Sequence, residues 1–268
     1  MNRIDRRFAE LSRAGRTGLI PFIAAGDPLP EATVPVMHAL VAAGADLIEL
    51  GVPFSDPMAD GPVIQKASER AIAAGVGASA VLAMVREFRR QDGDTPVVLM
   101  GYLNPVEIHG RERFVAEAAQ AGVDGLLLVD APVEESASLG PLLAGHGLHQ
   151  ILLAAPTTRG DRLQRLAGQA GGFLYYVAFA GVTGASHLEP AAVAERVAAI
   201  KALGSVPVAV GFGVKDAASA RAVAAHADAV VVGSALVDTL AGCADPETAA
   251  ADAAAFLAPL RAALDQGG

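Results

Sequence analysis

The stretch AGADLIEL at residues 43–50 decides the fold, because a helix end runs there directly into an apolar, strand-like series. The same phrase returns as AGVDGLLL at residues 121–128 and as AHADAVVV at residues 225–232. A helix-to-strand junction that recurs along the chain predicts a fold built from one repeated unit.

Apolar runs of this kind are each followed by an amphipathic, alanine-rich stretch. We expect eight strands, at residues 18–24, 46–50, 96–100, 125–129, 149–153, 172–177, 206–210 and 228–232. The long interval after the second strand accommodates two helices, at about 62–74 and 78–91. Alternating strands and helices with short linkers indicate an α/β fold with a parallel sheet, and eight such units close into a (βα)8 TIM barrel. No linker interrupts the series, so we expect a single domain over residues 1–268.

The two ends of the chain add helices to this plan. Ile4, Phe8 and Leu11 recur at helical spacing, so an extra N-terminal helix is expected before the first strand, plugging the N-terminal mouth of the barrel. An alanine-rich last helix is expected at about 246–265.

Composition excludes several classes of function. The net charge is −9, from 29 acidic and 20 basic residues, and no basic stripe is present to follow a nucleic acid backbone. No apolar run approaches the roughly 18 residues of a membrane span, and the charged N-terminus does not have the form of a secretory signal. The single cysteine, Cys243, allows no internal disulfide and favours the cytoplasm. The histidines do not cluster with carboxylates, so no metal site is expected.

Glu49 is a carboxylate inside the second strand, and its burial requires compensation. Strand alternation sends Glu49 and Leu47 to one side and Ile48 and Leu50 to the other. If the second pair meets the helices, Glu49 points into the barrel, one residue from the predicted strand end, where active sites of such barrels lie. The alternative is a buried acid satisfied by backbone or water.

Asp60 follows in the next loop, just before a helix expected to begin near Val63. Helix N-cap and catalyst are about equally good interpretations of Asp60. Asp56 has the weaker claim, since Ser-Asp-Pro is equally typical of a turn. One desolvated and one more exposed carboxylate on one rim suit acid–base catalysis at neutral pH.

Glycine-rich turns end the last two strands, GFGV at 211–214 and GSALV at 233–237. Barrels often bind phosphate after strands seven and eight, although simple glycine turns remain the alternative. The loop at 178–190 is either a mobile lid or a plain flexible connection. Only one of Tyr175 and Tyr176 can face the interior, where a carboxylate is a suitable partner for its hydroxyl. The three lysines all lie in predicted helices or a loop, which disfavours Schiff-base chemistry.

Several segments together resemble one family. ELGVPFSDPMADGP at 49–62, followed by IQKA, is similar to the signature of the tryptophan synthase α subunit. The resemblance extends through IPFIAAGDP at 20–28, MGYLNP at 100–105, VDAPVEES at 129–136, GVTGA at 181–185, GFGV and GSALV, and so covers nearly the whole chain.

The resemblance implies retro-aldol cleavage of indole-3-glycerol phosphate to indole and D-glyceraldehyde 3-phosphate. Glu49 would act as general acid and base, and Asp60 would bind the indole N–H. The other substrate-binding residues that it implies are Phe22, Met100, Tyr102, Tyr175 and Phe212 around indole, Gly184, Gly213, Gly233 and Ser234 near phosphate, Gly211 as a further substrate-binding residue, and Thr183 closing the lid over Asp60.

The resemblance also implies an α2β2 assembly in which a β subunit carries pyridoxal phosphate and receives the indole, with no cofactor on this chain. The partner-facing surface would comprise residues 53–57, 104–105 and 130–132. One segment, Ala178-Phe179-Ala180, departs from the serine-containing segment expected before GVTG. A stand-alone indole-releasing lyase and a non-catalytic barrel that activates a partner enzyme remain alternatives.

Overall fold

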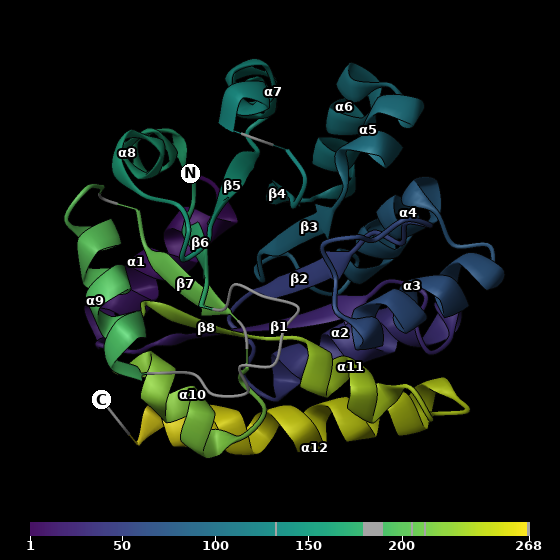
Figure 1. Cartoon of the computed structure of the whole chain (residues 1–268). Helices are drawn as coiled ribbons and strands as arrows, with labels where there is room; N and C mark the ends of the chain where they lie inside the picture. Colours follow the sequence, from purple (N-terminus) through teal and green to yellow (C-terminus); the bar gives the residue numbers. More distant parts are fainter. Residues whose placement is uncertain (132, 179–189, 205, 212, 267–268) are drawn as a thin grey trace.

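A computed structural model describes residues 1–131, 133–178, 190–204, 206–211 and 213–266. Its parallel strands close into a barrel in the order β1 to β8, with β1 pairing β8, and the helices surround it (Figure 1). The expected (βα)8 barrel is therefore confirmed. The strands are β1 Gly18–Ala24, β2 Ile48–Gly51, β3 Val97–Gly101, β4 Gly125–Leu128, β5 His149–Ala154, β6 Leu174–Val177, β7 Val208–Gly211 and β8 Ala229–Val232.

Helices follow the strands around the outside of the barrel. Their bounds are α1 Arg3–Ala14, η1 Pro30–Ala32, α2 Thr33–Ala42, α3 Pro62–Ala73, α4 Ala78–Phe88, α5 Leu103–His109, α6 Arg111–Ala121, α7 Val133–Gly145, α8 Gly160–Gln169, α9 Pro190–Lys201, α10 Ala217–Ala224, α11 Ser234–Leu240 and α12 Pro246–Asp265. The two helices expected after the second strand are α3 and α4. The short helix α5 was not predicted, because it is too brief to show a period, whereas α11 begins where a helical start was expected after the eighth strand.

The three similar segments at residues 43–50, 121–128 and 225–232 form the same kind of helix-to-strand junction. Its aspartate, at the start of an even-numbered strand, accepts a backbone N–H near the start of the preceding strand. The bonds are Leu19 N to Asp46 at 2.9 Å, Val97 N to Asp124 at 2.9 Å and Val208 N to Asp228 at 2.8 Å. Each carboxylate also meets a cation, Arg261 at 2.9 Å, Arg89 at 2.8 Å and Lys201 at 2.8 Å, respectively. The aspartate of each segment thus fixes the register of two neighbouring strands at the N-terminal mouth of the barrel.

Strand alternation divides the core in two. One set of side chains, including Leu50, packs outward against the helices. The other fills the barrel and includes Leu47 and the buried face of α1, Ile4, Phe8 and Leu11. The ring of Phe8 lies 5.6 Å from that of Phe173, between centroids. The predicted plug helix is confirmed.

Several predicted strand ends were wrong by one or two residues. Three strands end on a glycine, at Gly51, Gly101 and Gly211, where the sequence favoured a loop. Glu49 consequently lies two residues before the end of β2, not one.

Within the described residues, no single helix is long and apolar enough to cross a membrane; α3 and α4 meet the length and composition only as a pair bent by 93°. One domain over residues 1–268 stays a prediction.

Candidate active site

Glu49 points into the barrel. Its neighbours Ile48 and Leu50 belong to the outer core, while Leu47 belongs to the interior. In the sheet, Glu49 lies between Phe22 of β1 and Val98 of β3, and it is fully buried. The alternation argument therefore placed this side chain on the correct side.

Within the described residues, neither carboxylate oxygen of Glu49 has a hydrogen-bond partner, so their backbone does not satisfy the charge. Burial raises its pKa to about 8, from an ordinary value of 4.5. A neutral carboxylic acid in an apolar setting avoids most of the cost of a buried anion. With this pKa, the carboxyl group of Glu49 holds its proton at neutral pH.

The two tyrosines of β6 face opposite ways, as alternation requires. Tyr175 belongs to the interior and Tyr176 to the outer core. Burial, followed by the charge of Glu49, raises the pKa of Tyr175. A carboxylate was a suitable partner for the inward hydroxyl, but Glu49 does not bond it, because neither Glu49 oxygen is hydrogen-bonded within the described residues.

Asp60 is bonded by a different tyrosine. The hydroxyl of Tyr102 donates to Asp60 Oδ2 at 3.0 Å and accepts the N–H of Ala59 at 3.0 Å. Burial raises the pKa of Asp60, and the Tyr102 hydrogen bond partly lowers it. Helix α3 begins at Pro62, with Gly61 as an N-cap that makes no side-chain bond. The N-cap interpretation of Asp60 is therefore wrong.

An apolar cluster covers the C-terminal end of the barrel beside Glu49. Phe22 packs there with Ile64 of α3 and Met100 of β3. A β-carbon on Gly51 would lie 2.7 Å from the Phe22 ring, so glycine makes room for the aromatic side chain. Neither Ile64 nor Gly51 was predicted as a site residue. The signal for Ile64 was its position one helical turn after Asp60, in IQKA.

Gly211 has the same relation to Tyr175. A β-carbon there would lie 2.0 Å from the Tyr175 hydroxyl oxygen, so we expect Gly211→Ala to lower the free energy of unfolding by about 1–3 kcal/mol. Chemical denaturation measures this change. Gly242→Ala is the control, because a β-carbon there meets nothing within 4 Å. Equal stability of the two variants would contradict the contact.

The predicted phosphate-binding residues are only partly described. Gly213 has a φ of 76°, in the left-handed region that favours glycine. Gly233 is the N-cap of α11 and Ser234 its first residue, and no side chain caps this end. Backbone N–H groups at such an end attract anions. Thr183, Gly184, Phe179, Ala180, Pro132 and Phe212 lie outside the described residues.

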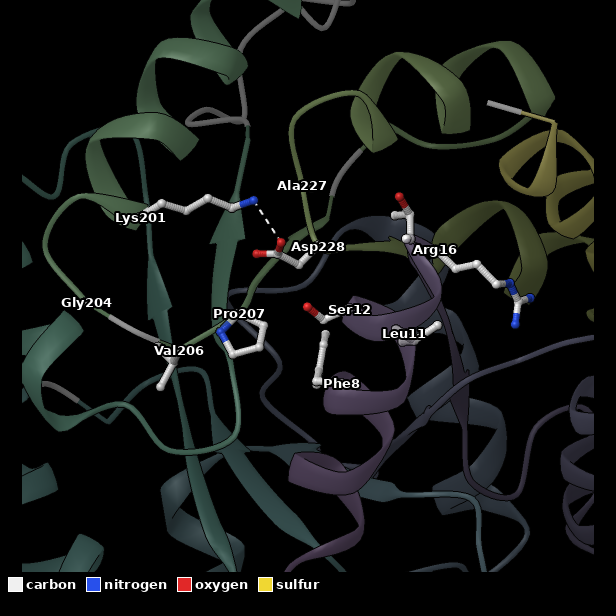
Figure 2. Close-up of a pocket in the computed structure, with 12 residues that line it drawn as sticks. Phe8, Leu11, Ser12, Arg16, Lys201, Gly204, Val206, Pro207, Ala227 and Asp228 are labelled. Carbon is white, nitrogen blue, oxygen red and sulfur yellow. Dashed lines mark hydrogen bonds and ion pairs between the residues drawn. The ribbon is translucent and has the colours of Figure 1, made fainter. Parts of the chain in front are cut away.

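A hollow of about 490 Å³ lies at the other end of the molecule. It opens between α1 and the starts of β7 and β8, beside the ion pair of Lys201 and Asp228 (Figure 2). These are the N-terminal ends of the strands, so the hollow is separate from Glu49. Among the described residues, no three His, Cys, Asp or Glu side chains are grouped as metal ligands.

Comparison with known proteins agrees with this geometry. Residues 8–265 match the family model described as tryptophan synthase alpha chain. The chain belongs to the tryptophan synthase alpha chain family. It is 61% identical to the alpha chain of Xanthomonas axonopodis pv. citri over 268 residues, covering 100% of each, and 59% identical to that of Xylella fastidiosa strain 9a5c, covering 99% of each.

Solved structures of tryptophan synthase superimpose on this fold. The subunit alpha from Legionella pneumophila gives a TM-score of 0.90 at 43% identity, covering 99% of each chain. A chain from the open form of the Mycobacterium tuberculosis enzyme gives 0.86 at 34%, covering 98% of each. The match to the tryptophan synthase alpha chain family thus spans every strand of the barrel, including β2, and the loop that carries Asp60.

Proposed function

We propose that Glu49 and Asp60 are the catalytic pair of this member of the tryptophan synthase alpha chain family, which cleaves indole-3-glycerol phosphate to indole and D-glyceraldehyde 3-phosphate. The observation that carries the proposal is a buried Glu49 with a raised pKa next to an apolar cluster, with Asp60 just before α3, the helix that contributes Ile64 to that cluster. This arrangement provides a proton donor, an apolar surface for an aromatic ring and a polar acceptor for its N–H.

The reaction then proceeds by proton transfer. Glu49 protonates indole C3 and takes the proton of the glyceryl hydroxyl, so the bond between C3 and the side chain breaks and the aldehyde forms. The electron pair of that bond returns to the ring. Asp60 accepts a hydrogen bond from the indole N–H and stabilises the positive charge that develops when C3 is protonated. Phe22, Met100, Tyr102, Tyr175 and Phe212 contact the ring in this proposal.

Phosphate is held in the proposal by N–H groups of Gly184, Gly213, Gly233 and Ser234. Gly211 is a further substrate-binding residue, and Thr183 closes over Asp60. Support comes from the uncapped start of α11 and the left-handed Gly213. Indole release from indole-3-glycerol phosphate by the purified chain tests the function, and the non-catalytic alternative requires that no indole appears.

Tyr102 offers a test of how Asp60 is tuned. Because its hydroxyl donates to Asp60 Oδ2, Tyr102→Phe should raise the pKa of Asp60 further above its ordinary value. The acid limb of the pH profile of kcat/KM should therefore move to higher pH. Tyr176→Phe is the control, since Tyr176 faces the outer core. An unchanged acid limb would show that Asp60 does not set it.

We further propose a β subunit carrying pyridoxal phosphate as partner, in an α2β2 assembly. Met58 and Ile108, which follow the C-terminal ends of β2 and β3, are 83% and 79% exposed. Large apolar side chains this exposed suit a protein interface. Asp130 Oδ1 accepts the Leu103 N–H at 2.8 Å, which ties one expected partner-facing segment to the residue just before another, residues 104–105.

Indole release with and without the cognate β chain distinguishes a subunit from a stand-alone lyase, because a subunit should be strongly stimulated. We propose the cytoplasm as the location, supported by the single cysteine, and cell fractionation tests it.

A further inference from the structure

Asp27 is a buried carboxylate outside the proposed catalytic pair. It lies in the loop after β1, and its side chain is 2% exposed. Arg70 of α3 donates to both oxygens, from Nε at 2.6 Å and from Nη2 at 3.1 Å. A two-bond guanidinium–carboxylate contact fixes orientation as well as distance. The loop after β1 therefore holds α3 in one position.

A second contact holds the same end of α3. Val76, just after the helix, lies against Gly26, where a β-carbon would come within 2.7 Å of Val76 Cγ2. Gly26 has a φ of 89°, and its N–H donates to Thr33 Oγ1 at 2.9 Å. The loop that carries Asp27 is thus itself fixed, and it can act as an anchor for the helix.

The opposite end of α3 holds the segment that carries Asp60. Gln65 Nε2 donates to the backbone oxygen of Asp60 at 2.9 Å and to that of Pro57 at 3.3 Å. Between the two ends, Ala67 is fully buried and packs with Phe22. A helix is a rigid element, so a shift at Arg70 is transmitted to Pro62 at the start of α3, about 12 Å away along the helix, and from there to the adjoining segment that carries Asp60.

We infer that Arg70, held by Asp27, is a positioning residue that sets Asp60 over the substrate through α3. The inference rests on the proposed function. Displacement of a reacting or binding group by about 1 Å is enough to lower a rate by up to about 10²-fold. Neither Arg70 nor Asp27 touches the substrate in this account, so their effect passes entirely through the placement of Asp60.

A double-mutant cycle tests the coupling. Arg70→Met should lower kcat/KM by about 10-fold in the natural chain but have no further effect in an Asp60→Asn background. Arg70→Lys, which keeps the charge without the planar fork, should recover part of the loss. Arg3→Met is the control, because Arg3 meets Asp124 at 2.9 Å with 30% and 3% side-chain exposure, against 37% and 2% for Arg70 and Asp27.

The cycle overturns the inference if Arg70→Met costs the same factor in both backgrounds, or if Arg3→Met costs as much. Hydrogen exchange over residues 57–66 provides a readout without substrate. It should quicken in Arg70→Met and not in Arg3→Met, since only the first releases α3. If the natural chain releases no indole, the proposed function fails, while equal exchange in the two variants rejects the positioning role separately.

Discussion

Replacing Glu49 with glutamine is expected to lower kcat by about 10²–10⁴-fold, the range for loss of a general acid–base. Glutamine fills nearly the same volume in the barrel and cannot transfer the proton. Steady-state indole release measures the loss. Glu112→Gln is the control, because Glu112 is exposed and lies outside the candidate site. Retained turnover in Glu49→Gln would remove Glu49 from the mechanism.

The same substitution should stabilise the protein at alkaline pH. The folded state binds a proton at Glu49 up to pH about 8, and the unfolded chain only up to its ordinary pKa of 4.5. Glu49 therefore lowers the free energy of unfolding of the natural chain. This loss of stability is absent below pH 4.5, grows as the pH rises and is complete above pH 8. At about 1.4 kcal/mol per pKa unit, the stability advantage of Glu49→Gln should grow by roughly 4 kcal/mol between pH 5 and 9.

Denaturant unfolding at these two pH values measures the difference, with Glu112→Gln again as control. If the difference in free energy of unfolding between the natural chain and Glu49→Gln were the same at both pH values, Glu49 would have an ordinary pKa. Its proposed role as a neutral acid would then fail. Loss of activity together with gain of stability is typical of a residue retained for chemistry.

The direction of Glu49 was predictable because strand periodicity is local. Ile48 and Leu50 had to face one way, and the only large apolar surface outside a barrel is its helix layer. The ends of the strands were not predictable in the same way. β2 and β7 each run on to a glycine, Gly51 and Gly211, and Phe22 and Tyr175 occupy the space that a side chain would need there. That contact is made between strands and is invisible in either segment alone.

Which polar side chains bond to one another was also not predictable from the sequence. The sequence offered carboxylates and tyrosines on one rim without saying which would meet. Tyr102 bonds Asp60, and Tyr175 leaves Glu49 unbonded. The same holds for the pair of Asp27 and Arg70, 43 residues apart. Such pairs depend on how far each loop reaches over the barrel, which periodicity does not encode.

Asp60→Asn is expected to lower kcat/KM by about 10²-fold, a loss comparable to that at Glu49. The neutral amide retains an oxygen that can accept the Tyr102 hydroxyl, so the loop should keep its place. It lacks the negative charge that stabilises the developing positive charge on the indole ring. Steady-state kinetics of indole release measures the effect.

Stability separates this catalytic role from a structural one. Gly61 is the N-cap of α3 and no side chain caps that helix, so Asp60→Asn should change the free energy of unfolding by less than the roughly 1 kcal/mol of a lost cap. Asp56→Asn is the matched control, since Asp56 is an exposed carboxylate in the same loop. Full activity with a loss of about 1 kcal/mol would return Asp60 to the role of a cap. Loss of activity at unchanged stability leaves the carboxylate charge as the cause, because shape and hydrogen bonding are preserved.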